Sequence, residues 1–287
     1  MPINYETLKA RAFPVVEQAY TARDTILYAL GLGLGADPLD EAQLRFTFEE
    51  AEGFSALPTM ACVLGTPGFW SREPGTGITW QKILHGEQGF RIHAPIPPEA
   101  TLIARNRIKE IIDKGADKGA LIYLEREISD MVTGQRIATT TSTTFARADG
   151  GFGGPSGPVK PVHALPERVP DVVMDWPTLP QAALIYRLSG DPNPLHASPA
   201  VAAAAGFKVP ILHGLCTLGV AGYAVLRTMA NNDPSRLTGL DLRFSAPVYP
   251  GETVRTEMWR DGEVVSFRAL VGERVVLNNG KATVTDG

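Results

Sequence analysis

A short segment of the chain carries three side chains that can hold or move a proton. Asp191, Asn193 and His196 fall within six residues, and prolines stand at positions 192 and 194. Each proline excludes the residue before it from helical geometry, so this backbone is expected to form an extended turn. Asp and Asn are also ordinary turn residues, but a carboxylate and an imidazole fixed on a stiff turn are what proton-transfer catalysis requires. The segment therefore predicts a general acid–base site.

A second element, His213-Gly214, stands at the start of a long apolar segment. Residues 214–229 are apolar almost all round, which predicts a helix that is buried on most sides. The first amides of a helix have no acceptor within it and carry the positive end of its dipole. Gly214 lets a ligand approach the backbone closely, so its amide is predicted to bind an oxyanion. A shorter helix is expected upstream, with Ser198 as its N-cap and Gly206 at its end.

The chain divides nearly in the middle at a segment rich in glycine and proline, residues 148–166. Such a segment supports neither a helix nor a central strand and is predicted to be a linker. The halves resemble each other, because Ala94–Leu102 and Ala246–Val254 both read Ala-Pro-x-x-Pro-x-x-Thr-apolar, and Leu57-Pro58 falls on Val209-Pro210 at the same offset. The shared offset indicates an internal duplication. We therefore expect an N-terminal domain over 1–147, the linker over 148–166 and a C-terminal catalytic domain over 167–287.

Each half continues from its helix into segments that are typical of strands. Strands are expected near 79–93, 100–114, 118–130 and 135–147, and again near 238–246, 252–260, 263–271 and 274–284. A helix followed by consecutive antiparallel strands is typical of α+β proteins. A curved sheet wrapped around the apolar helix would bury it. The predicted fold class is α+β, a double hot dog in which two antiparallel sheets each wrap around a central helix.

The composition is that of an ordinary globular protein, with 44% hydrophobic and 20% charged residues. A net charge of −4 gives no basic footprint for nucleic acid, and no apolar run reaches the length that spans a bilayer. Cys62 and Cys216 lie in apolar segments and are expected to be buried thiols rather than a disulfide or a metal site. The N-terminus lacks the basic and apolar regions of a signal peptide, so a cytoplasmic location is expected.

One family resembles the chain at these positions. The turn motif, Ser-Gly-Asp-x-Asn-Pro-x-His over 189–196, and the later His213-Gly214 resemble the type-2, (R)-specific enoyl-CoA hydratases, also called MaoC-like dehydratases. Tyr20–Asp24 and Tyr28–Gly31 look like the start of the two-domain members, and Leu242–Glu252 is similar to the family's late strand and turn. The resemblance implies reversible hydration of a trans-2-enoyl-CoA to an (R)-3-hydroxyacyl-CoA by syn addition of water, with no metal and no redox cofactor.

The resemblance also implies a role for each residue. Asp191 and His196 would hold one water molecule between them, remove its proton and return a proton to the α-carbon, while Asn193 would orient the water or the carboxylate. The Gly214 amide would bind the thioester oxygen. Two further residues, His213 and Arg243, are candidates for substrate binding. His213 can instead pack behind the site, and Arg243 can be an exposed strand residue instead of a contact to the CoA phosphates.

Two other functions are open at this level: a hot-dog acyl-CoA thioesterase and a non-catalytic acyl-CoA-binding module. Thioester hydrolysis attacks the carbonyl carbon, for which the motif is not the usual arrangement, and an intact acid–base set argues against a binding module. The N-terminal half has no counterpart of the motif and is expected to accommodate the acyl chain beside a short helix near Pro58 to Leu64. The expected partner is an acyl-CoA substrate, and a homodimer is a further expectation. The remaining histidines lack metal-ligand spacing and are interpreted as surface or structural residues: His85, His93 and His163.

Overall fold

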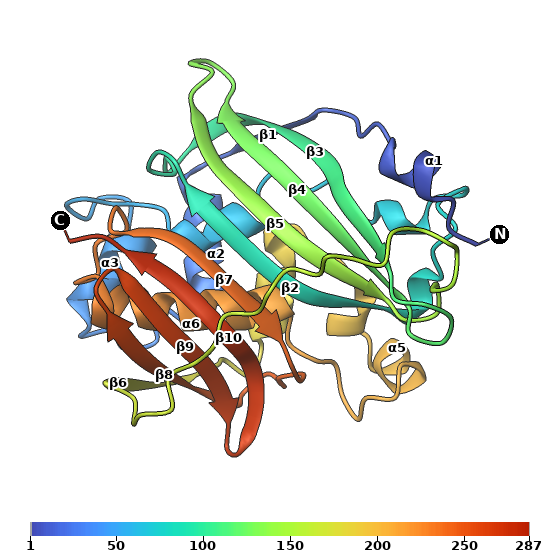
Figure 1. The fold of residues 1–287 in the computed structure, drawn as a ribbon. Helices are drawn as coiled ribbons and strands as arrows, with labels where there is room; N and C mark the ends of the chain where they lie inside the picture. Colours follow the sequence, from blue (N-terminus) through green and yellow to red (C-terminus); the bar gives the residue numbers. More distant parts are fainter. Residues whose placement is uncertain (1, 287) are drawn as a thin grey trace.

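The computed structural model describes residues 2–286 and is built around one antiparallel sheet of ten strands (Figure 1). Across the sheet the strands follow the order β1-β3-β4-β5-β2-β7-β10-β9-β8-β6. The N-terminal half supplies β1 (Val16–Tyr20), β2 (Ile83–Ile92), β3 (Ala100–Asp113), β4 (Ala120–Asp130) and β5 (Arg136–Ala146). The C-terminal half supplies β6 (Val172–Pro177), β7 (Leu237–Phe244), β8 (Thr253–Asp261), β9 (Val264–Val271) and β10 (Arg274–Val284).

The order of the strands is symmetric about the pair β2–β7. Outward from this seam the strands are β5, β4, β3 and β1 on one side and β10, β9, β8 and β6 on the other. Each half therefore repeats one topology, and the two Ala-Pro motifs precede corresponding strands, β3 and β8. The predicted duplication and the α+β double hot-dog fold are confirmed, with the two sheets joined edge to edge at the seam.

The helices are unequal in the two halves. The C-terminal half has the long helix α6 (Gly214–Met229), which packs against β6 to β10 and is almost entirely buried, as its apolar sequence predicts. The corresponding element of the N-terminal half is the 3₁₀ helix η1 (Pro58–Cys62). The predicted shortness of this helix is confirmed. The other helices are α1 (Tyr5–Lys9), α2 (Ala22–Gly31), α3 (Glu41–Thr47), η2 (Trp70–Arg72), η3 (Trp80–Lys82), α4 (Ala182–Tyr186), η4 (Arg187–Ser189), η5 (Pro194–His196) and α5 (Pro199–Ala204).

Both halves contribute to one main hydrophobic core, which lies between the sheet and the helices α2 and α6. Residues 149–171 form no helix or strand and cross the opposite face of the sheet, drawn yellow-green in Figure 1. The His163 ring is hydrogen-bonded to the Ser266 hydroxyl at 2.8 Å, which anchors this segment on β9. The exact domain boundaries stay a prediction. Within residues 2–286, no helix is long and apolar enough to cross a membrane.

Candidate active site

The turn motif, residues 189–196, runs from the last residue of η4 to the end of η5. Gly190 ends η4 in the left-handed region at φ 117°, which an L side chain rarely adopts, and the chain then passes through the two prolines as expected. Asn193 caps η5, because its side-chain oxygen accepts a hydrogen bond from the Leu195 amide at 3.1 Å. The main-chain amide of Asn193 donates to Oδ1 of Asp191 at 3.1 Å. Asn193 therefore orients the carboxylate through its backbone, while its side chain shapes the turn.

His196 lies at the end of η5 and is only 8% exposed. Its Nδ1 lies 2.8 Å from the main-chain oxygen of Ile211. A carbonyl oxygen only accepts, so Nδ1 carries the proton and Nε2 carries the lone pair. Burial lowers the pKa of His196, so the ring is neutral at pH 7 and can accept a proton or a hydrogen bond at Nε2.

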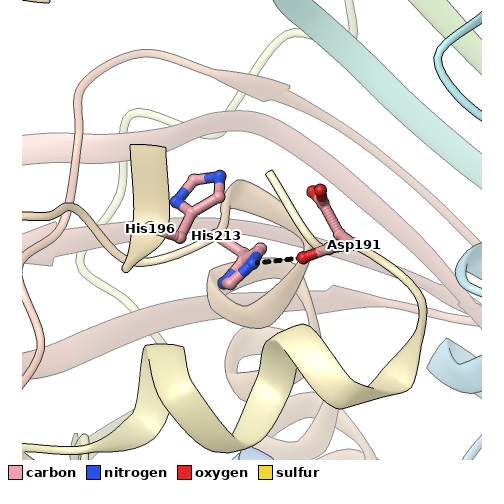
Figure 2. Close-up of side chains that lie close together, drawn as sticks. All are labelled: Asp191, His196 and His213. Atoms are coloured by element: carbon pink, nitrogen blue, oxygen red, sulfur yellow. Dashed lines mark hydrogen bonds between the residues drawn. The ribbon is translucent and has the colours of Figure 1, made fainter. Parts of the chain in front are cut away.

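The carboxylate of Asp191 and the rings of His196 and His213 form one cluster (Figure 2). One candidate ligand atom from each of the three lies within 4.8 Å of the others. A water molecule with two hydrogen bonds of about 2.8 Å at a tetrahedral angle separates its partners by about 4.6 Å. The limit of 4.8 Å on the separation of the Asp191 carboxylate and the His196 ring is therefore compatible with one bridging water.

His213 contacts both members of this pair. It is 1% exposed and occupies the N-cap position of α6, and its Nε2 donates to the main-chain oxygen of Asp191 at 3.2 Å (Figure 2). Its ring stacks on His196 with centroids 3.7 Å apart and an angle of 27° between the planes, and the Tyr186 ring lies 5.1 Å away. Two effects lower the pKa of His213 to about 4: the larger is burial, and the second is the neighbouring His196. Both stacked rings are therefore neutral at pH 7.

The stacking also bears on metal binding. A carboxylate and two imidazoles are a common set of zinc ligands, which bind with nitrogens about 2 Å from the ion. A histidine directs its lone pair in the plane of its ring, and the two planes here run nearly parallel at van der Waals separation. The planes therefore do not meet at a point 2 Å from both nitrogens, and this arrangement does not fit one metal ion.

Gly214 begins α6 and is exposed. Its amide is one of the first in the helix, so it has no intrahelical acceptor and lies at the positive end of the helix dipole. A side chain at this position would meet the Phe244 ring at 3.1 Å. The Phe244 ring therefore packs directly against Gly214, and a larger residue at position 214 would push it away from the start of the helix.

The structure does not bring Arg243 to this cluster. Successive residues of a strand point to opposite faces, and Phe244 faces Gly214, so Arg243 points to the other face of β7. There it pairs with Glu87 at 3.3 Å and lines a cavity of about 670 Å³ between the sheet and the linker.

His85, interpreted from the sequence as a surface or structural residue, lies closer to this site than the sequence indicated. Its ring lies 4.7 Å from that of Phe244, beside the exposed Gly214. The sequence signal was weak, because only the pairing of β2 with β7 places this histidine near the turn. By contrast, His93 and His163 bond to the hydroxyls of Thr139 and Ser266 in ordinary structural contacts. Cys62 and Cys216 are free and buried as expected.

Known proteins match the chain over its whole length. A family model described as "MaoC like domain" matches residues 161–281, and one described as "MFE-2 hydratase 2 N-terminal domain" matches residues 18–148. The chain is 39% identical to "3-hydroxyacyl-thioester dehydratase Y" of Mycobacterium tuberculosis, with 100% of each chain covered. It is 38% identical to "Enoyl-CoA hydratase ChsH3" of the same organism, covering 100% of this chain and 98% of that protein.

Solved structures agree with the sequence matches. The crystal structure of a MaoC-like dehydratase from Phytophthora capsici has a TM-score of 0.87 at 34% identity, covering 99% of this chain and 100% of that one. The family models, the full-length relatives and the solved structure thus agree on one family. The chain belongs to the MaoC-like dehydratases, in the double hot-dog form that also contains the hydratase 2 domains.

Proposed function

We propose that the protein, a hydro-lyase by its family, reversibly hydrates trans-2-enoyl-CoA to (R)-3-hydroxyacyl-CoA, with Asp191 and His196 activating the water. One observation carries the proposal: a carboxylate and a neutral imidazole lie within 4.8 Å of each other, next to an exposed helix N-terminal amide. The names of two full-length relatives, an enoyl-CoA hydratase and a 3-hydroxyacyl-thioester dehydratase, describe the two directions of one reaction.

The proton balance of the reaction suits the pair. As the water oxygen bonds to the β-carbon of the enoyl group, the pair takes one proton from the water. A proton is returned to the α-carbon, so the pair ends with the proton count with which it began. His196 holds a lone pair at Nε2, and the Asn193 amide holds the Asp191 carboxylate in place. General acid–base catalysis of this kind contributes ~10²–10⁴-fold in rate.

The Gly214 amide takes the charge that the reaction develops. When the nucleophile adds at the β-carbon, the thioester oxygen gains enolate character. An N–H donor aimed at that oxygen contributes about 3 kcal/mol. The amide at the start of the 16-residue helix α6 is suited to this task, since the helix dipole adds to its own partial charge.

The rest of the assignment follows from the same chemistry. The steps need no redox group, since the C–O bond gained by the β-carbon and the C–H bond gained by the α-carbon leave no net change in oxidation state, and the stacked histidines argue against a resident metal. The short helix η1 supports a role of the N-terminal half in accommodating the acyl chain. A contact of Arg243 with CoA phosphates, a homodimer and a cytoplasmic location stay predictions; some relatives are named as peroxisomal proteins.

Crotonyl-CoA tests the proposal directly. Hydration removes the absorbance of the conjugated enoyl thioester without releasing a thiol, and chiral analysis of the product is expected to give the (R)-3-hydroxyacyl-CoA. Release of free CoA would show thioester hydrolysis instead. Binding of the acyl-CoA with no loss of enoyl absorbance would leave a binding module.

A further inference from the structure

The N-terminal half also reaches the reacting centre, through His85 on β2. At the seam of the sheet, Glu87 lies opposite Arg243 and Gln88 opposite Leu242. The start of β2 therefore lies beside the end of β7, which is where Phe244 faces Gly214.

A bulge turns His85 toward this side of the sheet. The pairing of β2 with β5 shifts register between His85 and Glu87, so one extra residue is inserted there. Strict alternation would place His85 and Gln88 on opposite faces, because they are three residues apart. Instead, Nε2 of His85 lies 3.0 Å from Oε1 of Gln88 in a hydrogen bond, while Glu87 pairs with Arg243 on the other face.

The contacts of His85 lead to the oxyanion amide. Its ring lies 4.7 Å from the Phe244 ring at an angle of 54°, and Phe244 lies 3.1 Å from where a Gly214 side chain would stand. Desolvation by the surrounding protein lowers the pKa of this imidazole to about 4, so the ring is neutral at pH 7. The negative charge of Asp191 acts in the opposite direction and raises the pKa of the same imidazole.

We propose that His85 is a substrate-positioning residue: its ring and the Phe244 ring form one wall beside the start of α6, and the thioester end of the acyl-CoA lies against this wall with its oxygen at the Gly214 amide. The inference rests on the proposed hydration and adds a residue from the N-terminal half to the site. An enoyl thioester is planar. A flat wall at this point limits its rotation, so the double bond stays over the Asp191–His196 pair and the thioester oxygen stays at the amide.

Two variants at position 85 test the wall. His85→Ala removes the ring, whereas His85→Phe keeps a ring against Phe244 and loses only the bond to Gln88. We expect kcat/KM for crotonyl-CoA to fall by about 10² in H85A, since misplacement by about 1 Å costs that much. H85F is expected to stay within about threefold of the wild type, as a rigid ring is retained. His93→Ala is the matched control, because His93 also makes one hydrogen bond from the N-terminal half but follows β2 at its other end.

A binding measurement separates this inference from the proposed function. Butyryl-CoA has the thioester but no double bond, so calorimetry reports the wall without turnover. We expect its Kd to rise about tenfold in H85A and to stay unchanged in H93A, with thermal unfolding of both variants close to that of the wild type. The positioning role of His85 would be contradicted if H85A kept the wild-type kcat/KM and Kd. It would also be contradicted if H85F were as impaired as H85A. A wild-type protein that leaves crotonyl-CoA unchanged but loses butyryl-CoA binding in H85A would overturn hydration and support the wall.

Discussion

Replacing Asp191 by asparagine removes one charge from the site and leaves its shape. The new amide oxygen can still accept the hydrogen bond from the Asn193 amide that now reaches Oδ1 at 3.1 Å. The main-chain oxygen of residue 191 still accepts from His213. The variant therefore keeps the turn and loses only the proton acceptor that lies within 4.8 Å of the imidazoles.

The size of the effect follows from the role of that acceptor. A positioned acid or base is worth ~10²–10⁴-fold, which corresponds to about 3–5 kcal/mol of barrier. His196 retains its lone pair and can still hold the water, but one neutral imidazole does not replace a pair. We expect kcat for crotonyl-CoA to fall by about 10³ in D191N, while KM changes by less than about threefold. His196→Ala is expected to lower kcat by a similar factor.

The assay is the loss of enoyl absorbance under saturating substrate, with thermal unfolding measured alongside. Asp175→Asn provides the matched control, because this aspartate is exposed on β6 and pairs with Arg255 at 3.5 Å. The control removes the same charge as D191N, but at a position outside the candidate active site. The control is expected to keep full activity. A D191N variant that retained more than about a tenth of kcat would refute the acid–base pair, because no other change in that variant compensates for the lost carboxylate.

Three further predictions follow from the same geometry. Gly214→Ala is expected to lower kcat about tenfold or more, because its methyl group would crowd the Phe244 ring at 3.1 Å and displace it beside the amide; an unchanged kcat would contradict a thioester that lies against this amide. His213→Phe keeps a ring against His196 but leaves the main-chain oxygen of Asp191 without its donor. Urea titration should therefore show that the free energy of unfolding falls by about 1–3 kcal/mol. An unchanged free energy of unfolding would show that this hydrogen bond does not stabilise the fold. Burial lowers the pKa of His213 from 6.5 to about 4 and lowers that of His196 in the same direction, so between pH 6.5 and 4 the unfolded chain binds more protons than the folded one. Stability should therefore fall as the pH drops through this window, and unfolding midpoints that stay constant from pH 7 to 4 would contradict buried neutral rings.

Local patterns were enough to predict most of the fold. The apolar segment of α6 and the eight strands β2–β5 and β7–β10 lie where their residue types indicate, with ends that differ by a few residues. The edge strands β1 and β6 were not predicted. They are short, and their backbones are held in place by pairing with β3 and β8, which the local sequence does not reveal.

The site shows the same limit. The turn and the helix start carry their chemistry in adjacent residues, so Asp191, His196 and Gly214 could be named from the motif. The neutral state of the histidines depends on burial and on a ring stacked from another segment, which only the folded chain supplies. The position of the His85 ring depends on a bulge in β2 and on the pairing of the two halves at the seam. A sequence pattern reveals neither the bulge at this residue nor the contact with Phe244.

The unequal halves of the duplication fit the proposal that only one of them holds the acid–base site. The second half has a full helix, so its first amide is free and polarised by the dipole. In the first half the helix stops after five residues, and the main-chain oxygens of Cys62 and Leu64 at its end are bonded by the guanidinium of Arg126. Burial lowers the pKa of this arginine to about 10, so it remains charged at neutral pH and caps the end of the short helix within the protein interior. The sequence holds a single Asp-x-Asn-Pro-x-His motif. Titration with a tight-binding acyl-CoA analogue should therefore give one site per chain, and a second equivalent site would contradict this division between the halves.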